Sequence, residues 1–154
     1  MAHDSYSQEF TSGSENETSQ IAKDFAEILQ MGDVVALRGE LGSGKTFFVK
    51  KVVEKLGFNG YVSSPTFTIL NIYEASTHLY HFDFYRLNNI EAIEKIGFYD
   101  LLMEDGIFFI EWPEKAEELF PDEYFEIRFD IINITHRKIS IKKITGNEDA
   151  LCRN

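Results

Sequence analysis

Gly39-Glu40-Leu41-Gly42-Ser43-Gly44-Lys45-Thr46 decides the fold, because it matches the pattern G-x-x-x-x-G-K-[ST] at every position. Glycines let the backbone wrap with successive N–H groups pointing inward, which creates a binding site for phosphate. Lys45 would reach the β- and γ-phosphates, and the Thr46 hydroxyl would bind magnesium. We therefore predict a site for ATP with Mg²⁺. The residues predicted to contact the nucleotide here are Gly42, Ser43, Gly44, Lys45, Thr46 and Phe47.

The segments on either side of this loop have the patterns that a phosphate-binding loop requires. Val34–Leu37 is an unbroken apolar run, which is typical of a strand buried on both faces of a parallel sheet. After the loop, apolar residues recur at helical spacing until Gly57; they are Phe48, Val49, Val52, Val53 and Leu56. The phosphates would then lie at a helix N-terminus, where the backbone dipole favours negative charge.

Two apolar strands farther along the chain end in acids. Leu79–Phe82 is followed by Asp83, and Ile107–Ile110 is followed by Glu111. Enzymes with this loop use a carboxylate across the sheet to hold magnesium or its water, so both acids are candidates. The alternative for each is a solvated strand end. Ser64-Pro65-Thr66 is either a switch segment that senses the γ-phosphate or a tight turn, and the sequence leaves both open.

The remaining elements complete an α/β pattern. Ser14 and Glu17 form a capping box for a helix that ends near Gly32, and a strand is expected at Phe67–Tyr73. Short helices should follow Asn89 and begin at Pro113.

From Tyr124 the apolar residues alternate with polar ones, as in an antiparallel hairpin, and Arg137–Ile144 would be its second strand. We predict a single domain over residues 1–154: a P-loop NTPase-like three-layer α/β sandwich with a mostly parallel central sheet and a C-terminal antiparallel hairpin. Residues 1–13 and 146–154 are expected to be frayed, although a short strand at Tyr6–Phe10 is possible.

Composition excludes several classes of protein. The net charge of −11 opposes phosphate backbones, so a stand-alone RNA or DNA binder is not expected. The sequence has no apolar run of membrane-spanning length and no export signal at its start, so we expect a cytoplasmic protein without membrane contact. The four histidines show no metal-binding spacing, and His81 is expected to be a packed strand residue.

With these features in order, the chain resembles the bacterial TsaE family, also called YjeE. The resemblance spans about residues 14–145 and rests on four blocks: Gly39–Thr46, Ser64-Pro65-Thr66-Phe67-Thr68, Tyr80-His81-Phe82-Asp83-Phe84-Tyr85-Arg86 and Glu111-Trp112-Pro113. Ser43 stands where the family more often has Ala, and Glu40 where it often has Asp; neither change threatens nucleotide binding.

The resemblance implies a slow ATPase that acts with two partner proteins, TsaD and TsaB. Together they transfer threonylcarbamoyl to the adenosine beside the anticodon of ANN-decoding tRNAs, so tRNA would be contacted only through the complex. By position, Thr46 and Glu111 would hold magnesium, and Lys45, Asp83, Glu111 and Trp112 would form the catalytic set. Ser14 and Arg137 would lie near the nucleotide.

Two other functions share the same loop. A small-molecule kinase of this class usually brings arginines over the phosphates on a lid, and the five arginines here show no such cluster. A nucleotide-gated binding module without significant hydrolysis is hard to distinguish from a slow ATPase by sequence.

Overall fold

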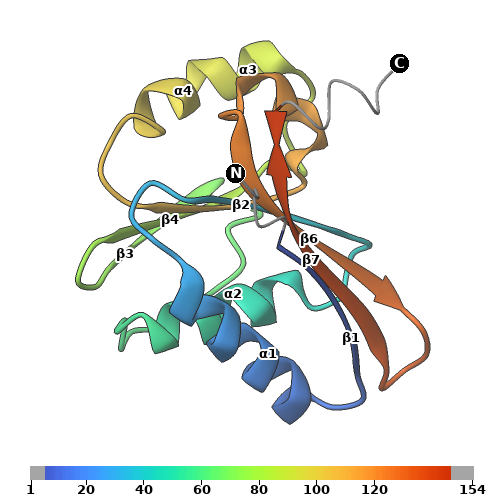
Figure 1. The fold of residues 1–154 in the computed structure, drawn as a ribbon. Coiled ribbons are helices and arrows are strands. Elements are labelled where there is room, and N and C mark those ends of the chain that lie inside the picture. Colours follow the sequence, from blue (N-terminus) through green and yellow to red (C-terminus); the bar gives the residue numbers. More distant parts are fainter. Residues whose placement is uncertain (1–5, 147–154) are drawn as a thin grey trace.

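The computed structural model describes residues 6–146, in which strand β2 (Val34–Gly39) lies in the middle of a seven-stranded sheet (Figure 1). The other strands are β1 (Ser7–Ser12), β3 (Leu70–Glu74), β4 (His78–Asp83), β5 (Ile107–Glu111), β6 (Glu123–Ile131) and β7 (Arg137–Thr145). Their spatial order is β1-β7-β6-β2-β5-β4-β3. The four central strands, β6, β2, β5 and β4, are parallel, whereas β3, β7 and β1 each pair antiparallel with a neighbour. The prediction of a parallel centre with an antiparallel hairpin is confirmed.

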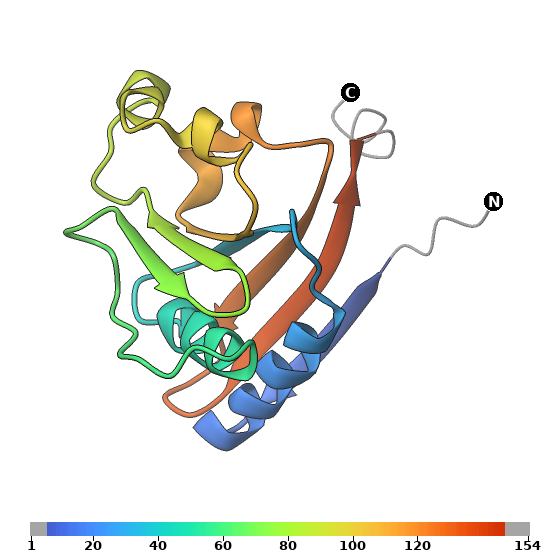
Figure 2. The same cartoon turned by 90° about the vertical axis from the view of Figure 1, so that its left-hand side faces the viewer.

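Helices cover both faces of this sheet (Figure 2). The helices α1 (Glu15–Ile28) and α2 (Lys45–Lys55) lie on one face, and the other carries α3 (Ile90–Lys95), α4 (Phe98–Leu101) and the 3-10 helix η1 (Pro113–Leu119). Successive side chains of a strand point to opposite faces. Val35 and Leu37 therefore pack with α1 and α2, while Val34 and Ala36 belong to the second core. Two apolar cores explain why the central strands are apolar throughout.

Side chains at the helix starts act as the sequence predicts. Ser14 Oγ accepts a hydrogen bond from the Glu17 backbone N–H at 3.1 Å, and Glu17 Oε2 accepts one from the Gly13 N–H at 2.7 Å. Asn89 Oδ1 likewise accepts from the Ala92 N–H at 2.9 Å. These bonds satisfy backbone donors that have no partner inside the helix.

Two sequence expectations need correction. Residues 1–13 were expected to be frayed, but Ser7–Ser12 form an edge strand because their backbone pairs with β7. The strand expected from Phe67 begins only at Leu70, because the four residues before Ile69 form a turn. The C-terminal hairpin joins the sheet as predicted, because β6 pairs with β2. The expected fraying after residue 146 lies outside the described residues.

Within residues 6–146, no helix is both long enough and apolar enough to span a bilayer.

Candidate phosphate-binding site

The glycine-rich loop leaves the end of β2 and enters α2 with the backbone conformation of an anion-binding nest. Gly42 and Gly44 have φ values of 78° and 105°, in the left-handed region that side chains rarely adopt. Gly39 is required for a different reason: a Cβ there would lie 2.6 Å from Ser43 Oγ and 2.9 Å from the Phe129 carbonyl oxygen. The loop can therefore wrap tightly before Lys45 begins α2.

Lys45 is folded back into the site. Its side chain is only 5% exposed, its Nζ donates to the Gly39 carbonyl oxygen at 2.5 Å, and the same atom lies 3.8 Å from the centre of the Trp112 ring. Burial lowers the pKa of Lys45, although Glu111, Asp83 and Glu114 act in the opposite direction. This ammonium group, buried beside the loop, is a good receptor for a polyphosphate.

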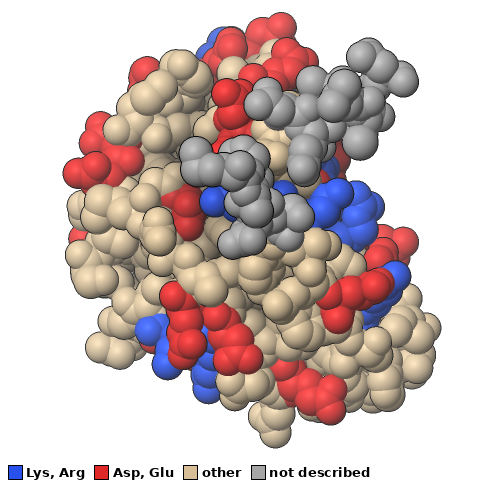
Figure 3. Space-filling model, in the orientation of Figure 1, with Lys and Arg blue, Asp and Glu red and all other residues tan. Residues whose placement is uncertain are grey.

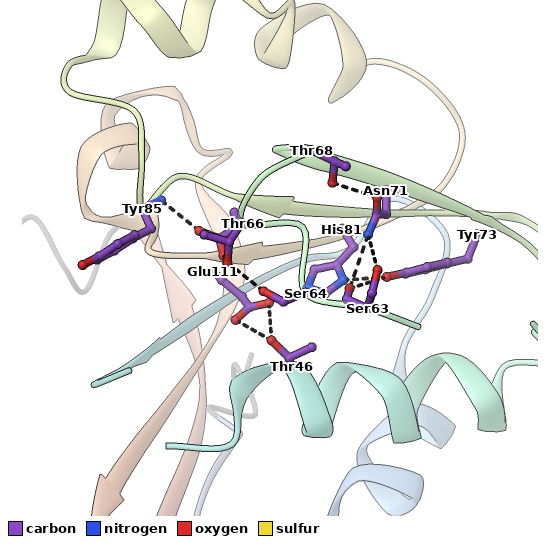
Figure 4. Close-up of polar contacts among 11 residues, drawn as sticks. Thr46, Ser63, Ser64, Thr66, Thr68, Asn71, Tyr73, His81, Tyr85 and Glu111 are labelled. Carbon is purple, nitrogen blue, oxygen red and sulfur yellow. Dashed lines mark hydrogen bonds and ion pairs between the residues drawn. The ribbon is translucent and has the colours of Figure 1, made fainter. Parts of the chain in front are cut away.

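Thr46 and Glu111 meet where α2 begins and β5 ends. Thr46, in the first turn of α2, places Oγ1 at 3.1 Å from both carboxylate oxygens of Glu111, the last residue of β5 (Figure 4). A hydroxyl and a carboxylate are the hard oxygen ligands that Mg²⁺ prefers, and this ion usually takes only one or two of them from protein. No cluster of three or more acidic, His or Cys side chains that could hold a metal occurs in the described range. The donor set therefore fits magnesium bound together with phosphates.

Asp83 is the second buried acid. In the pairing of β4 with β5 it stands opposite Glu111. Its carboxylate accepts hydrogen bonds from the Thr66 hydroxyl and the Tyr85 backbone N–H, both at 2.8 Å. Burial raises the pKa of Asp83, and the nearby Glu111 adds to the effect, while the hydrogen bonds from Tyr85 and Thr66 lower it.

Ser64-Pro65-Thr66 is both a turn and part of the site. The Ile69 N–H donates to the Pro65 carbonyl oxygen at 2.6 Å, which closes the turn. Ser64 and Thr66 line the same cavity as the phosphate loop, and their hydroxyls lie 2.8 Å apart. The interpretation of this segment as a tight turn and its interpretation as a switch segment are thus compatible.

Two residues beside the acids have strained backbones. Trp112 and Ile69 have φ values of 57° and 69°, and they are the only non-glycine residues with positive φ among residues 6–146. Such conformations cost free energy and cluster at functional sites. Trp112 contacts Lys45 and packs against Tyr85, with 5.0 Å between ring centres.

Two adjoining cavities share the phosphate loop. One, of 220 Å³, is lined by the loop together with Thr66, Asp83, Glu111 and Trp112, so the structure brings together the residues predicted for catalysis. The other, of 430 Å³, includes Ser14 and Arg137 in its wall. Gly42, Ser43, Gly44 and Phe47 line both cavities. A nucleotide would need such a pair of adjoining cavities, one for its phosphate chain and one for its nucleoside.

Not every predicted contact residue has its polar group free. Ser14 Oγ caps α1, and Arg137 Nη1 donates to the carbonyl oxygens of Asn133 and His136 at 2.7 and 3.2 Å. Ser43 Oγ, in contrast, is the one buried side-chain polar atom in the described part of the chain without a hydrogen-bond partner.

Sequence reasoning missed His81 as a site residue. It was expected to be a packed strand residue, and it is fully buried, but its Nε2 lies 2.6 Å from Glu111 Oε2 (Figure 4). Its Nδ1 lies 2.9 Å from the Tyr73 hydroxyl. One signal was present: His81 precedes Asp83 by two residues in one strand, so both side chains must point to the same face.

Comparisons with known proteins identify the family of this chain. The family model described as threonylcarbamoyl adenosine biosynthesis protein TsaE matches residues 12–139. A relative from Rickettsia typhi, named tRNA threonylcarbamoyladenosine biosynthesis protein TsaE, is 38% identical, covering 86% of this chain and 93% of its own length. The protein of the same name from Bacillus subtilis is 36% identical over 88% of this chain and 85% of its own length.

The fold is similar to a solved structure as well. The crystal structure of Bacillus subtilis YdiB superposes with a TM-score of 0.76 at 29% identity, covering 99% of this chain and 95% of that chain. The chain belongs to the TsaE family.

Proposed function

We propose that this protein is the ATP-binding and ATP-hydrolysing component of the machinery that makes threonylcarbamoyladenosine in tRNA. The observation that carries the proposal is the contact of Thr46 with Glu111 beside the phosphate loop, at 3.1 Å. The contact brings a hydroxyl and a carboxylate together where the end of the loop and the end of β5 meet, which supports a metal site there. Family membership supports the pathway, because the relatives are named for that biosynthesis.

Each side chain has a role that follows from its position. Lys45 would leave the Gly39 carbonyl and bind the β- and γ-phosphates, which offsets the cost of its burial. Thr46 and Glu111 would hold Mg²⁺, which would supply positive charge to the phosphates during phosphoryl transfer. Asp83, whose raised pKa favours proton uptake, would orient the attacking water.

Trp112 is proposed as a sensor of the bound nucleotide. Its ring covers Lys45 Nζ, so movement of the ammonium group towards a phosphate must change the Trp112 contact. The same ring packs on Tyr85, whose backbone N–H binds Asp83. Trp112 and Asp83 would therefore transmit the nucleotide state to a partner surface.

The partners that we propose are TsaD-like and TsaB-like proteins, with tRNA bound through them. Phosphate release from ATP, measured for the pure protein and again after adding both partners, tests the proposal. Slow release that the partners stimulate is the expected result. Transfer of phosphate to a small molecule would favour a kinase, and nucleotide binding without release in either condition would favour a gated binding module.

A further inference from the structure

His81 is the one histidine in residues 6–146 that has no exposed surface, and both of its ring nitrogens are engaged. It lies on the face of the sheet that α1 and α2 cover, where its neighbours Tyr73 and Phe109 belong to the apolar core. A polar ring buried in such a core costs free energy unless its nitrogens are bonded. The hydrogen-bond partners of the two ring nitrogens therefore indicate what His81 does in the site.

The hydrogen bond to Glu111 determines where the ring proton lies. An ionised carboxylate only accepts hydrogen bonds, so the Nε2 atom at 2.6 Å from Glu111 Oε2 must carry the hydrogen. The Tyr73 hydroxyl, 2.9 Å from Nδ1, can then donate to the unprotonated nitrogen. Burial raises the pKa of Tyr73, so this hydroxyl keeps its proton. Tyr73 thus selects the form of His81 that donates to Glu111.

The same bond distinguishes the two carboxylate oxygens of Glu111. Oε2 of Glu111 accepts from His81 at 2.6 Å, and Thr46 Oγ1 lies 3.1 Å from both oxygens, so within the described residues Oε1 has Thr46 as its one side-chain hydrogen-bond partner. Figure 4 shows His81 and Thr46 on different sides of the carboxylate. Rotation of the carboxylate would break the short bond to His81, so the orientation of Oε1 is fixed.

We propose that His81, oriented by Tyr73, is a positioning residue that holds Glu111 Oε2 and so directs Oε1, together with Thr46, towards the metal of the bound nucleotide. This inference rests on the proposed function, because it takes Glu111 and Thr46 as the magnesium ligands. In metal sites, residues that orient the ligands typically contribute about 10- to 100-fold to metal affinity. His81 would act in this way through a carboxylate.

Two amide substitutions separate positioning from packing. The side-chain nitrogen of Gln can occupy the place of Nε2, whereas the amide of Asn reaches only the place of Nδ1. His81→Gln therefore keeps a donor for Glu111, and His81→Asn keeps only the contact with Tyr73. The dissociation constant of ATP is measured by calorimetry with and without Mg²⁺, and the melting temperature of each ligand-free variant is recorded.

His81→Asn should weaken ATP binding in the presence of Mg²⁺ by about tenfold or more and leave metal-free binding unchanged, whereas His81→Gln should restore most of the loss. Equal effects of the two variants, or no effect of either on binding with Mg²⁺, would overturn the inference. If wild-type binding itself does not depend on Mg²⁺, the proposed function fails instead.

Tyr73→Phe provides a second test that keeps the imidazole, in case neither His81 variant folds. It should also weaken ATP binding in the presence of Mg²⁺, and wild-type affinity would contradict the inference. Tyr80→Phe is the matched control, because it removes a hydroxyl from the neighbouring residue of β4 on the opposite face of the sheet, away from His81, and its affinity should remain that of the wild type.

Discussion

Asp83 and Glu111 stand opposite each other at the ends of two parallel strands, yet they have different hydrogen-bond partners. Glu111 is bound by Thr46 of the phosphate loop and by His81, while Asp83 is bound by Thr66 and the Tyr85 N–H. One acid is thus connected to the predicted metal ligand and the other to the Ser64–Thr66 turn. The two carboxylates should differ in their effects on binding and turnover.

We predict that Glu111→Ala weakens Mg²⁺-dependent ATP binding as well as turnover, because it removes a metal ligand. Asp83→Ala should leave affinity nearly intact while turnover with partners falls by about tenfold or more, or about 1.4 kcal/mol of barrier. Calorimetry with and without Mg²⁺, run beside phosphate release, separates the two effects. Glu74→Ala, at the exposed end of β3, is the control. The opposite pattern would reverse the two roles.

Lys45→Ala should abolish tight ATP binding, because the loop loses the cation that meets the phosphates. A ligand at a hundred times its dissociation constant stabilises a fold by about 2.7 kcal/mol, so Mg-ATP should raise the wild-type melting temperature by several degrees. The mutant should show almost no shift. Lys55→Ala, on the same helix but paired with Glu27, should behave as the wild type does. An equal shift in the Lys45 and Lys55 variants would contradict the assignment of the loop.

Asp83→Asn should raise the free energy of unfolding of the ligand-free protein above that of the wild type, and this difference should increase with pH. Burial raises the pKa of Asp83 above its ordinary value of 3.8, so the folded state holds this proton more tightly than the unfolded chain does. The free energy of unfolding of the wild type therefore decreases as pH rises from 3.8 through the raised pKa.

Asn has no such proton. The advantage of Asp83→Asn over the wild type should therefore grow across that interval and level off above it. Chemical denaturation at a series of pH values measures this difference, and a difference that stays constant with pH would show that the carboxylate is not penalised by burial.

Ser14→Ala should destabilise the protein by about 1 kcal/mol, because Ser14 Oγ caps α1. We expect little loss of ATP affinity, since this oxygen is already committed to the Glu17 N–H. Denaturant titration gives the first quantity and calorimetry the second. A large loss of affinity at unchanged stability would mean that the hydroxyl binds the nucleotide directly.

The pure protein should not bind tRNA measurably at physiological salt. Its net charge is −11, and Figure 3 shows Lys and Arg atoms on one face in small groups among acidic ones. Nucleic-acid affinity depends largely on Lys and Arg side chains that neutralise phosphates, and such a surface does not gather them in large groups. Filter binding with micromolar affinity for the isolated chain would contradict this expectation.

The sequence alone determined the features that depend on neighbours in the chain. Glycines at fixed spacing produce the phosphate loop, Ser14 with Glu17 caps a helix, and apolar runs such as Val34–Leu37 form buried strands. These patterns are local because they arise from backbone conformation, capping and side-chain periodicity. They were sufficient for the fold class, the loop and the two candidate acids.

The tertiary structure decided which distant segments meet. Residues 7–12 look frayed in isolation, and they form a strand only because β7, more than a hundred residues later, pairs with them. His81 looks like a packed residue until β5 is placed beside β4 in a register that brings its ring to Glu111. Strand order and register depend on hydrogen bonds and packing between remote segments, and no local pattern encodes a 2.6 Å contact across 30 residues.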